Sequence, residues 1–293
     1  MKISLKLLVL AIIVWVSISS ASILVILSKA PAEACAFWRL LISALILHVI
    51  GFYRDGNIRS IYVVLKRFKW YHLVASLGLA SHFILWMKSL FLIPVYISTL
   101  LVTLYPLYSL LGEIAILRYK PPPSQVLGLV SSIVLLVLFL RVENLIVNEG
   151  AILALLGGVA AAIYFEVGSY ARGNVGEDVV TYASHTYLLS SVLVLIYSLI
   201  SNITLFNYPP STYMYFILLA VIPMLFGHTV INYVLAHYPA SLITMIALGE
   251  PFGAGLLAYL VLGQSLEPQH LLYGVALIFT VLITLTKSTR RKG

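Results

Sequence analysis

The stretch PVYISTLLVTLYP at residues 94–106 and the stretch PASLITMIALGEP at residues 239–251 decide the fold. Each runs from one proline to the next over 13 residues, and the two stretches lie 145 positions apart. Pro123 has a counterpart at the same offset in Pro268. A fixed offset is the signature of internal duplication. The sequence therefore predicts two copies of one unit, at 1–145 and 146–293, that together form a single membrane domain.

Composition places these copies in a membrane. Hydrophobic residues make up 61% of the chain and charged residues only 10%, whereas soluble domains have about 25% charged residues. The mean hydropathy is +1.05. Because a spanning helix needs about 20 mostly apolar residues, we predict an all-α polytopic protein with ten transmembrane helices, at 7–27, 34–52, 70–90, 94–116, 125–141, 150–171, 180–202, 212–235, 239–262 and 268–286.

The predicted helix count also sets the orientation of the two copies. Five spans are an odd number, so the second copy enters the membrane from the opposite side and its helices run antiparallel to their counterparts. Inverted repeats of this kind are typical of secondary transporters, whose substrate site lies between the repeats near the bilayer midplane. We therefore expect two inverted five-helix repeats around a central cavity.

The net charge of +8 has a topological explanation. With both termini in the cytoplasm, 14 of the 18 basic residues lie on the cytoplasmic side, which is the positive-inside bias. We therefore expect an integral protein of the plasma membrane that contacts anionic lipids and binds no nucleic acid. The segment 1–27 has features of a signal peptide, but we expect it to be retained, because its loss would leave 150–171 without a counterpart.

Two polar stripes recur in the duplication. His82 and Trp86 reappear 146 positions later as His228 and Asn232. Residues four apart share a helix face, and polar groups near the bilayer centre normally face a bundle interior or a water-filled cavity. Both stripes are therefore predicted to line a shared cavity. The alternative, that each histidine only hydrogen-bonds a neighbouring helix, stays open.

Glu250 is the most distinctive single residue, since it lies near the middle of the span at 239–262. An ionised carboxylate at a helix centre costs roughly 2.5–3.5 kcal/mol on insertion scales. The adjacent Pro251 removes a backbone donor and should kink the helix. The pattern fits either substrate binding or a structural hydrogen bond that fixes the kink.

Four other charged residues are expected near helix ends. Arg39 and Lys88 lie toward the outer ends of their helices, where long basic side chains reach for the headgroups. Glu113 and Glu166 lie toward the inner ends, and Glu113 is expected near Arg118.

The sequence also resembles a known family over almost its entire length. It is similar to EamA-type members of the drug/metabolite transporter superfamily. The likeness rests on the five-plus-five organisation, Ala36-Phe37-Trp38-Arg39, the segment at 238–259, Leu262-Gly263-Gln264-Ser265, Gln269 and Gly274. The family usually has an acidic residue where this chain has Gln264.

The resemblance implies that the helices at 125–141 and 268–286 pack away from a central cavity and that transport proceeds by alternating access. It implies a secondary transporter of small organic solutes, either amino-acid-like metabolites or drugs, that works as an exporter. Carried onto this sequence, the candidate substrate-binding residues are Trp15, His82, Trp86, Tyr105, Tyr164, His228, Asn232 and Glu250.

The driving force is expected to be a solute gradient or coupled protons, since the chain has no Walker motif. His82, His228 and Glu250 are the candidates for proton coupling. We expect no catalytic residues, metal site or cofactor. Two other functions stay open: a flippase for lipid-linked intermediates, and an intramembrane lipid-modifying enzyme, for which the scattered histidines and the loop residues Asp55 and Asp178 offer little support. A homodimer also stays open.

Overall fold

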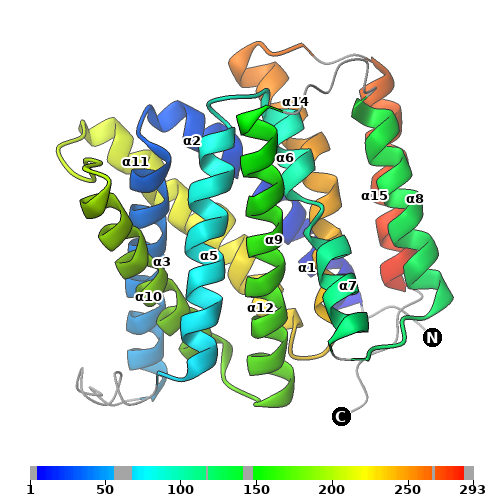
Figure 1. Ribbon diagram of the computed structural model, residues 1–293, viewed down its shortest axis with the longest axis horizontal. Coiled ribbons are helices and arrows are strands. Elements are labelled where there is room, and N and C mark those ends of the chain that lie inside the picture. Colours follow the sequence, from blue (N-terminus) through cyan, green and yellow to red (C-terminus); the bar gives the residue numbers. More distant parts are fainter. Residues whose placement is uncertain (1–4, 56–67, 117, 141–147, 266–267, 287–293) are drawn as a thin grey trace.

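The fold is a bundle of helices (Figure 1). A computed structural model describes residues 5–55, 68–116, 118–140, 148–265 and 268–286. Within these ranges all regular elements are helical. The prediction of an all-α protein is confirmed for the described part of the chain.

The first half of the chain supplies seven elements. They are α1 (Leu5–Ser19), α2 (Ala21–Ser28), α3 (Ala32–Asp55), α5 (Trp70–Ser89), α6 (Val95–Val102), α7 (Tyr105–Ala115) and α8 (Pro123–Leu140). The second half supplies α9 (Glu149–Ser169), η1 (Tyr170–Asn174), α10 (Val179–Ile200), α11 (Pro210–Leu219), η2 (Ala220–Thr229), α12 (Val230–Val234), α13 (Ala240–Thr244), η3 (Met245–Gly249), α14 (Glu250–Leu262) and α15 (Pro268–Thr286).

Seven helical runs in the described residues are long and apolar enough to cross a membrane. They are Leu5–Ser28, Ala32–Arg54, Val95–Ala115, Glu149–Asn174, Val179–Ile200, Pro210–Val234 and Ala240–Leu262. Pro123–Leu138 and Leu272–Leu285 are shorter apolar helices. The remaining predicted span, 70–90, corresponds to α5 and is the most polar of the ten. The expected count of ten is therefore supported in part.

Both proline-bounded stretches contain a break in the helix. The first is interrupted between α6 and α7, and the second passes through the 3₁₀ turn η3 before α14 begins. Pro106 and Pro251 lie in the first turns of α7 and α14, where a residue without a backbone N–H is tolerated. Consequently Tyr105 and Glu250 become the first residues of new helices in the middle of the bundle.

The two halves of the chain interleave. Close packing joins α1 with η2, α5 with α9, α3 with α10, α6 with α14, α7 with α13 and α8 with α15, so each pair takes one element from each half. Figure 1 shows α8 and α15 side by side at one edge of the bundle. The other pairs enclose the middle of the molecule.

Small residues allow the closest of these approaches. A Cβ atom added at Gly78 of α5 would lie 2.9 Å from the carbonyl oxygen of Ala160 in α9. One added at Gly157 would lie 3.2 Å from the backbone nitrogen of Trp86. Glycine therefore sets the spacing of α5 and α9, and this contact holds His82 and Trp86 against the second half of the chain.

Candidate functional site

A small cavity lies where the two halves meet. Its lining comes from α1, α2, α3, α5, α6, α7, η2, α12 and α14. The residues are Ile18, Ala21, Arg39, His82, Trp86, Val102, Tyr105, Pro223, His228, Ile231 and Glu250. Its free volume is about 20 Å³, which is room for about one water molecule. An organic solute therefore needs the cavity to widen before it can bind.

Arg39 contributes a cation to this cavity. Its side chain is fully buried, at 0% exposure, and none of its three guanidinium nitrogens has a hydrogen-bond partner among the described residues. The guanidinium carbon lies 4.1 Å from the centre of the Phe83 ring, a cation–π contact. A buried cation without a hydrogen-bonded anion is costly, and the acidic residue of the same cavity, Glu250, is not within the 4.0 Å of an ion pair.

The prediction that Arg39 anchors to headgroups is wrong. Sequence reasoning placed it near a helix end exposed to the membrane surface. In the structure α3 begins at Ala32, and its first turns are themselves buried and packed against α2 and α11. The Arg39 side chain is therefore enclosed by protein and lines the cavity. The available signal was its place in the duplication, since it recurs 146 positions later as the polar residue His185.

Glu250 contributes an acidic group to the same cavity. It is 7% exposed, and in the described part of the chain its carboxylate has neither a hydrogen bond nor an ion pair within 4.0 Å. The structural hydrogen bond considered from the sequence is thus not found there.

The two histidines lie together. The ring centres of His82 and His228 are 6.1 Å apart, and both side chains line the cavity. Nδ1 of His82 lies 3.0 Å from the carbonyl oxygen of Gly157. Because a carbonyl only accepts, Nδ1 is the donor and Nε2 of the neutral ring is left as an acceptor. His82 therefore satisfies both readings of the sequence, since it lines the cavity and bonds a neighbouring helix.

Aromatic rings complete the wall. Trp86 stacks on His82 with ring centres 5.9 Å apart, and its indole N–H has no partner among the described residues. His228 stacks on Phe165 at 5.7 Å, and Tyr105 contacts the same phenylalanine at 5.3 Å. The cavity thus combines flat apolar walls with a few unsatisfied polar atoms.

Tyr164 and Asn232, both predicted as substrate-binding, lie behind the cavity wall. Both side chains are fully buried, and Nδ2 of Asn232 donates to the Tyr164 hydroxyl and to the carbonyl oxygen of His228. The Tyr164 ring also contacts the His228 ring, at 6.0 Å between centres. Their observed contacts position His228.

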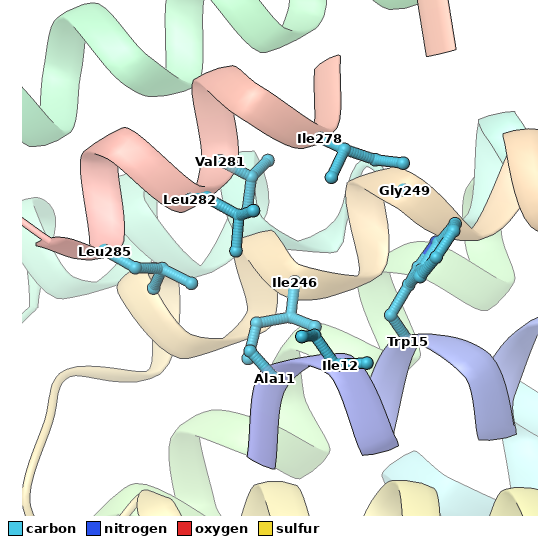
Figure 2. A pocket seen from close by; sticks show the side chains of 9 residues that line it. All are labelled: Ala11, Ile12, Trp15, Ile246, Gly249, Ile278, Val281, Leu282 and Leu285. Carbon is cyan, nitrogen blue, oxygen red and sulfur yellow. The ribbon is translucent and has the colours of Figure 1, made fainter. Parts of the chain in front are cut away.

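Trp15 lines a different pocket, of about 280 Å³, between α1, η3 and α15. Figure 2 shows the indole close to Gly249, with apolar side chains of α15 on the other side. A Cβ atom at Gly249 would lie 2.6 Å from Nε1 of Trp15, so glycine is required for this contact. The pocket is lined by Ala11, Ile12, Trp15, Ile246, Gly249, Ile278, Val281, Leu282 and Leu285.

Lys88, away from the cavity, has two partners. Nζ of Lys88 lies 2.8 Å from a carboxylate oxygen of Glu33 and donates to the Tyr197 hydroxyl at 3.0 Å. The structure thus replaces the expected headgroup contact of Lys88 with an ion pair.

No group of three or more His, Cys, Asp or Glu residues within the described ranges could hold a metal ion.

Glu113 is buried and joins the two halves of the chain. Its carboxylate accepts hydrogen bonds from the backbone nitrogen of Ser241, at 3.2 Å, and from the hydroxyl of the same residue. Gln125 in turn donates to that hydroxyl at 2.8 Å. Because Ser241 is in the first turn of α13, the carboxylate also lies at the positive end of a helix.

Comparison with known proteins gives a family match and a structural match. The profile described as the EamA-like transporter family matches residues 2–141 and, a second time, residues 148–286. No curated protein matches the sequence. A solved structure described only as "Crystal structure of protein" has a TM-score of 0.74 at 17% sequence identity, covering 96% of this chain and 97% of that chain. At this identity the likeness shows the fold alone.

Proposed function

Since the chain belongs to the EamA-like transporter family, we propose that it is a secondary transporter that exports small organic solutes by alternating access. The observation that carries the proposal is the central cavity, where residues from both repeats bring an unpaired cation and an unpaired carboxylate together. Unsatisfied charge in the middle of a membrane bundle marks a solute or ion pathway.

The pattern of helix contacts supports an inverted arrangement of ten helices. If the two halves are exchanged, the contact of α1 with η2 becomes that of α9 with α5, and the contact of α6 with α14 becomes that of α13 with α7. The contacts of α3 with α10 and of α8 with α15 each map onto themselves. A two-fold axis that exchanges the halves gives this pattern, and with five spans in each repeat that axis would lie in the membrane plane, as expected for inverted repeats.

Two polar contacts lie where helices would have to separate to open the pathway at either end. Glu33, Lys88 and Tyr197 meet where α3 begins and α5 ends, whereas Glu113 meets Ser241 where α7 ends and α13 begins. These places lie toward opposite ends of the bundle (Figure 1). We place the first on the outer side and the second on the inner side. In the alternating-access cycle, helices move at one end while the other stays closed.

The proposed orientation puts both termini in the cytoplasm and the protein in the plasma membrane. Its support is the charge distribution, since 14 of the 18 basic residues then face the cytoplasm. Proton coupling through His82, His228 and Glu250 is part of the proposal, because these three groups line one cavity and each can exchange a proton.

One observation favours a second candidate function, a flippase for lipid-linked molecules. The pocket beside Trp15 is large compared with the central cavity, and its lining contains no charged residue. An acyl chain would fit such a lining. Transfer of a fluorescent lipid between leaflets of proteoliposomes, measured by dithionite quenching, tests this function directly; we expect no increase over protein-free liposomes.

The transport proposal is tested by counterflow. Proteoliposomes loaded with an unlabelled solute are diluted into a trace of the same labelled solute, without ATP, for a panel of amino acids, organic acids and amphiphilic cations. Transient accumulation of at least one labelled compound, absent from protein-free liposomes, is the expected result. No accumulation of any compound in the panel, by protein that remains folded, would contradict transport of these solutes.

A further inference from the structure

Arg39 differs from Lys88 and Glu113 in having no hydrogen-bond partner in the described part of the chain, and it shares this with Glu250 of the same cavity. Lys88 pairs with Glu33, and Glu113 binds Ser241, but the guanidinium of Arg39 has no hydrogen-bond partner among the described residues. It is fully buried and lines the central cavity. We propose that Arg39 binds the carboxylate of the transported molecule, so that the transporter accepts small carboxylate-bearing solutes and rejects amphiphilic cations. This inference rests on the proposed transport function.

The geometry of the side chain fits this role. A guanidinium is planar, stays charged and presents its donors in a fork that matches the two oxygens of a carboxylate. The Phe83 ring centre lies 4.1 Å from the guanidinium carbon, and none of the guanidinium nitrogens has a hydrogen-bond partner among the described residues. The donors thus remain free for an occupant of the cavity.

The remaining groups in the cavity define the rest of the ligand. The carboxylate of Glu250 faces the same space and is not paired with Arg39 within 4.0 Å. An amino group on the solute can therefore bind Glu250 while its carboxylate binds Arg39. The Trp86 N–H, which has no partner in the described part of the chain, and Nε2 of His82 supply one further donor and one acceptor.

Charge complementarity then ranks three classes of solute. A zwitterion satisfies both Arg39 and Glu250, and a simple carboxylic acid satisfies Arg39 alone. An amine without a carboxylate can bind Glu250 but leaves Arg39 unpaired and adds a second positive charge beside it. In a low-dielectric cavity such like-charge pairing is strongly unfavourable. The acid and the amine differ because a carboxyl group can lose its charge by binding a proton, whereas a guanidinium stays charged. We expect binding to fall in this order.

The ranking is tested with three matched sets of compounds, built on leucine, phenylalanine and serine. Each set contains the amino acid, the amine left when the carboxylate is removed and the acid left when the amino group is removed. Binding to the purified full-length protein is followed by the rise in unfolding temperature, because a ligand stabilises the state that binds it. Amino acids should stabilise most and amines not at all.

Variants assign the effect to Arg39. Arg39→Gln should weaken binding of the carboxylate compounds about 100-fold, as expected when one member of a buried charge pair is removed. Arg39→Lys keeps the charge but loses the paired N–H donors of the guanidinium, and should weaken binding of the carboxylate compounds about tenfold. The matched control is Arg54→Gln, because Arg54 lies at the far end of α3 in a half-exposed ion pair with Asp178. It should bind like the wild type.

The proposal is overturned by stabilisation from the amines alone, by equal binding of carboxylates to wild type and Arg39→Gln, or by no binding from any carboxylate compound. If Arg39→Gln does not fold, Arg39→Lys decides, and unchanged affinity in that variant counts against the proposal. Counterflow of the same compounds distinguishes failure of the proposed role of Arg39 from failure of the proposed transport function. Transport of amines without carboxylates removes the role of Arg39 but keeps the transporter, whereas transport of no compound at all removes the proposed function.

Discussion

The ends of the bundle and its centre treat buried charge in opposite ways. Near one end, Glu33 is 3% exposed and lies 2.8 Å from the ammonium of Lys88. Near the other, Glu113 is buried and accepts two hydrogen bonds from Ser241. In both places each charge has a partner supplied by the chain itself, and the contact fastens one helix to another.

At the centre the chain supplies no such partner to its charges. Arg39 and Glu250 line one cavity, yet no hydrogen bond or ion pair joins either of them to a described residue. Leaving a charge unpaired inside a protein destabilises the fold, whereas paired charges at helix ends hold it. The difference separates charges that pair within the fold from the two charges that we propose to bind the transported solute.

Removing a central charge should therefore abolish function without loss of stability. Arg39→Leu eliminates a buried cation that has no partner, so we expect the unfolding temperature to stay constant or rise. Counterflow of carboxylate solutes should fall by about 100-fold or more, the loss expected for one partner of a buried charge pair. Thermal unfolding checks the expected stability, and counterflow with the same preparation checks the expected loss of transport. A large drop in stability would mean that Arg39 serves the fold.

Removing a paired charge at the end of the bundle should lower stability and leave solute binding intact. Glu113→Ala leaves the first turn of α13 without its acceptor, and hydrogen bonds to a charged group contribute about 1.5–3 kcal/mol each. We expect stability to fall by about 2 kcal/mol, with solute affinity retained in the protein that folds. Denaturation in a series of denaturant concentrations measures the loss. Unchanged stability would show that this contact does not fasten α7 to α13.

A third comparison concerns the ion pair of Lys88. Lys88→Met should cost about 1–2 kcal/mol, less than for a fully buried pair, because water screens the half-exposed ammonium. The double variant Lys88→Met with Glu33→Gln should recover part of that loss, since it no longer leaves a buried carboxylate unpaired. A double-mutant cycle of unfolding free energies gives the coupling. Strict additivity would mean that the two side chains do not interact.

The smallest effect is expected at Asp178, outside the membrane spans. Partial burial opposes ionisation of this carboxyl, but hydrogen bonds from Arg54 and from the backbone of Thr181 hold its pKa below the usual value. A lowered folded-state pKa contributes stability at neutral pH that is lost as pH falls through the acid range. Asp178→Asn should cost about 0.5–1 kcal/mol at pH 7 and less at a pH below the folded-state pKa of this carboxyl. An equal cost at both pH values would contradict this assignment.

Much of the fold was readable from the sequence because a membrane restricts the choices. The recurring prolines marked both the duplication and the helix breaks, and the break at Pro251 was anticipated from its missing N–H. His82, His228 and Glu250 stood out in the sequence as polar residues within apolar runs, and the structure brings all three to one cavity. These features could be predicted because a proline or a polar residue is easy to recognise in an otherwise apolar sequence.

The rest depended on tertiary packing. Arg39 looked like a surface anchor because the burial of its helix end by α2 and α11 is invisible in the sequence. Trp15 was placed in the central cavity, but helix rotation turns it toward α15. Tyr164 and Asn232 were also predicted to bind substrate; the structure shows them bonded to each other behind the wall, and that role stays a prediction. Periodicity finds the inward side of a helix, but not which neighbour that side meets.

Site-directed labelling from each side of the membrane tests the central claim most directly. The chain has a single cysteine, Cys35, so Cys35→Ser gives a background into which Val102→Cys places one thiol in the cavity wall. The account predicts that a membrane-impermeant thiol reagent reaches this position from either side of oriented vesicles, and that a transported solute slows the reaction. Labelling from one side only, whatever the solute gradient, would contradict alternating access to the cavity.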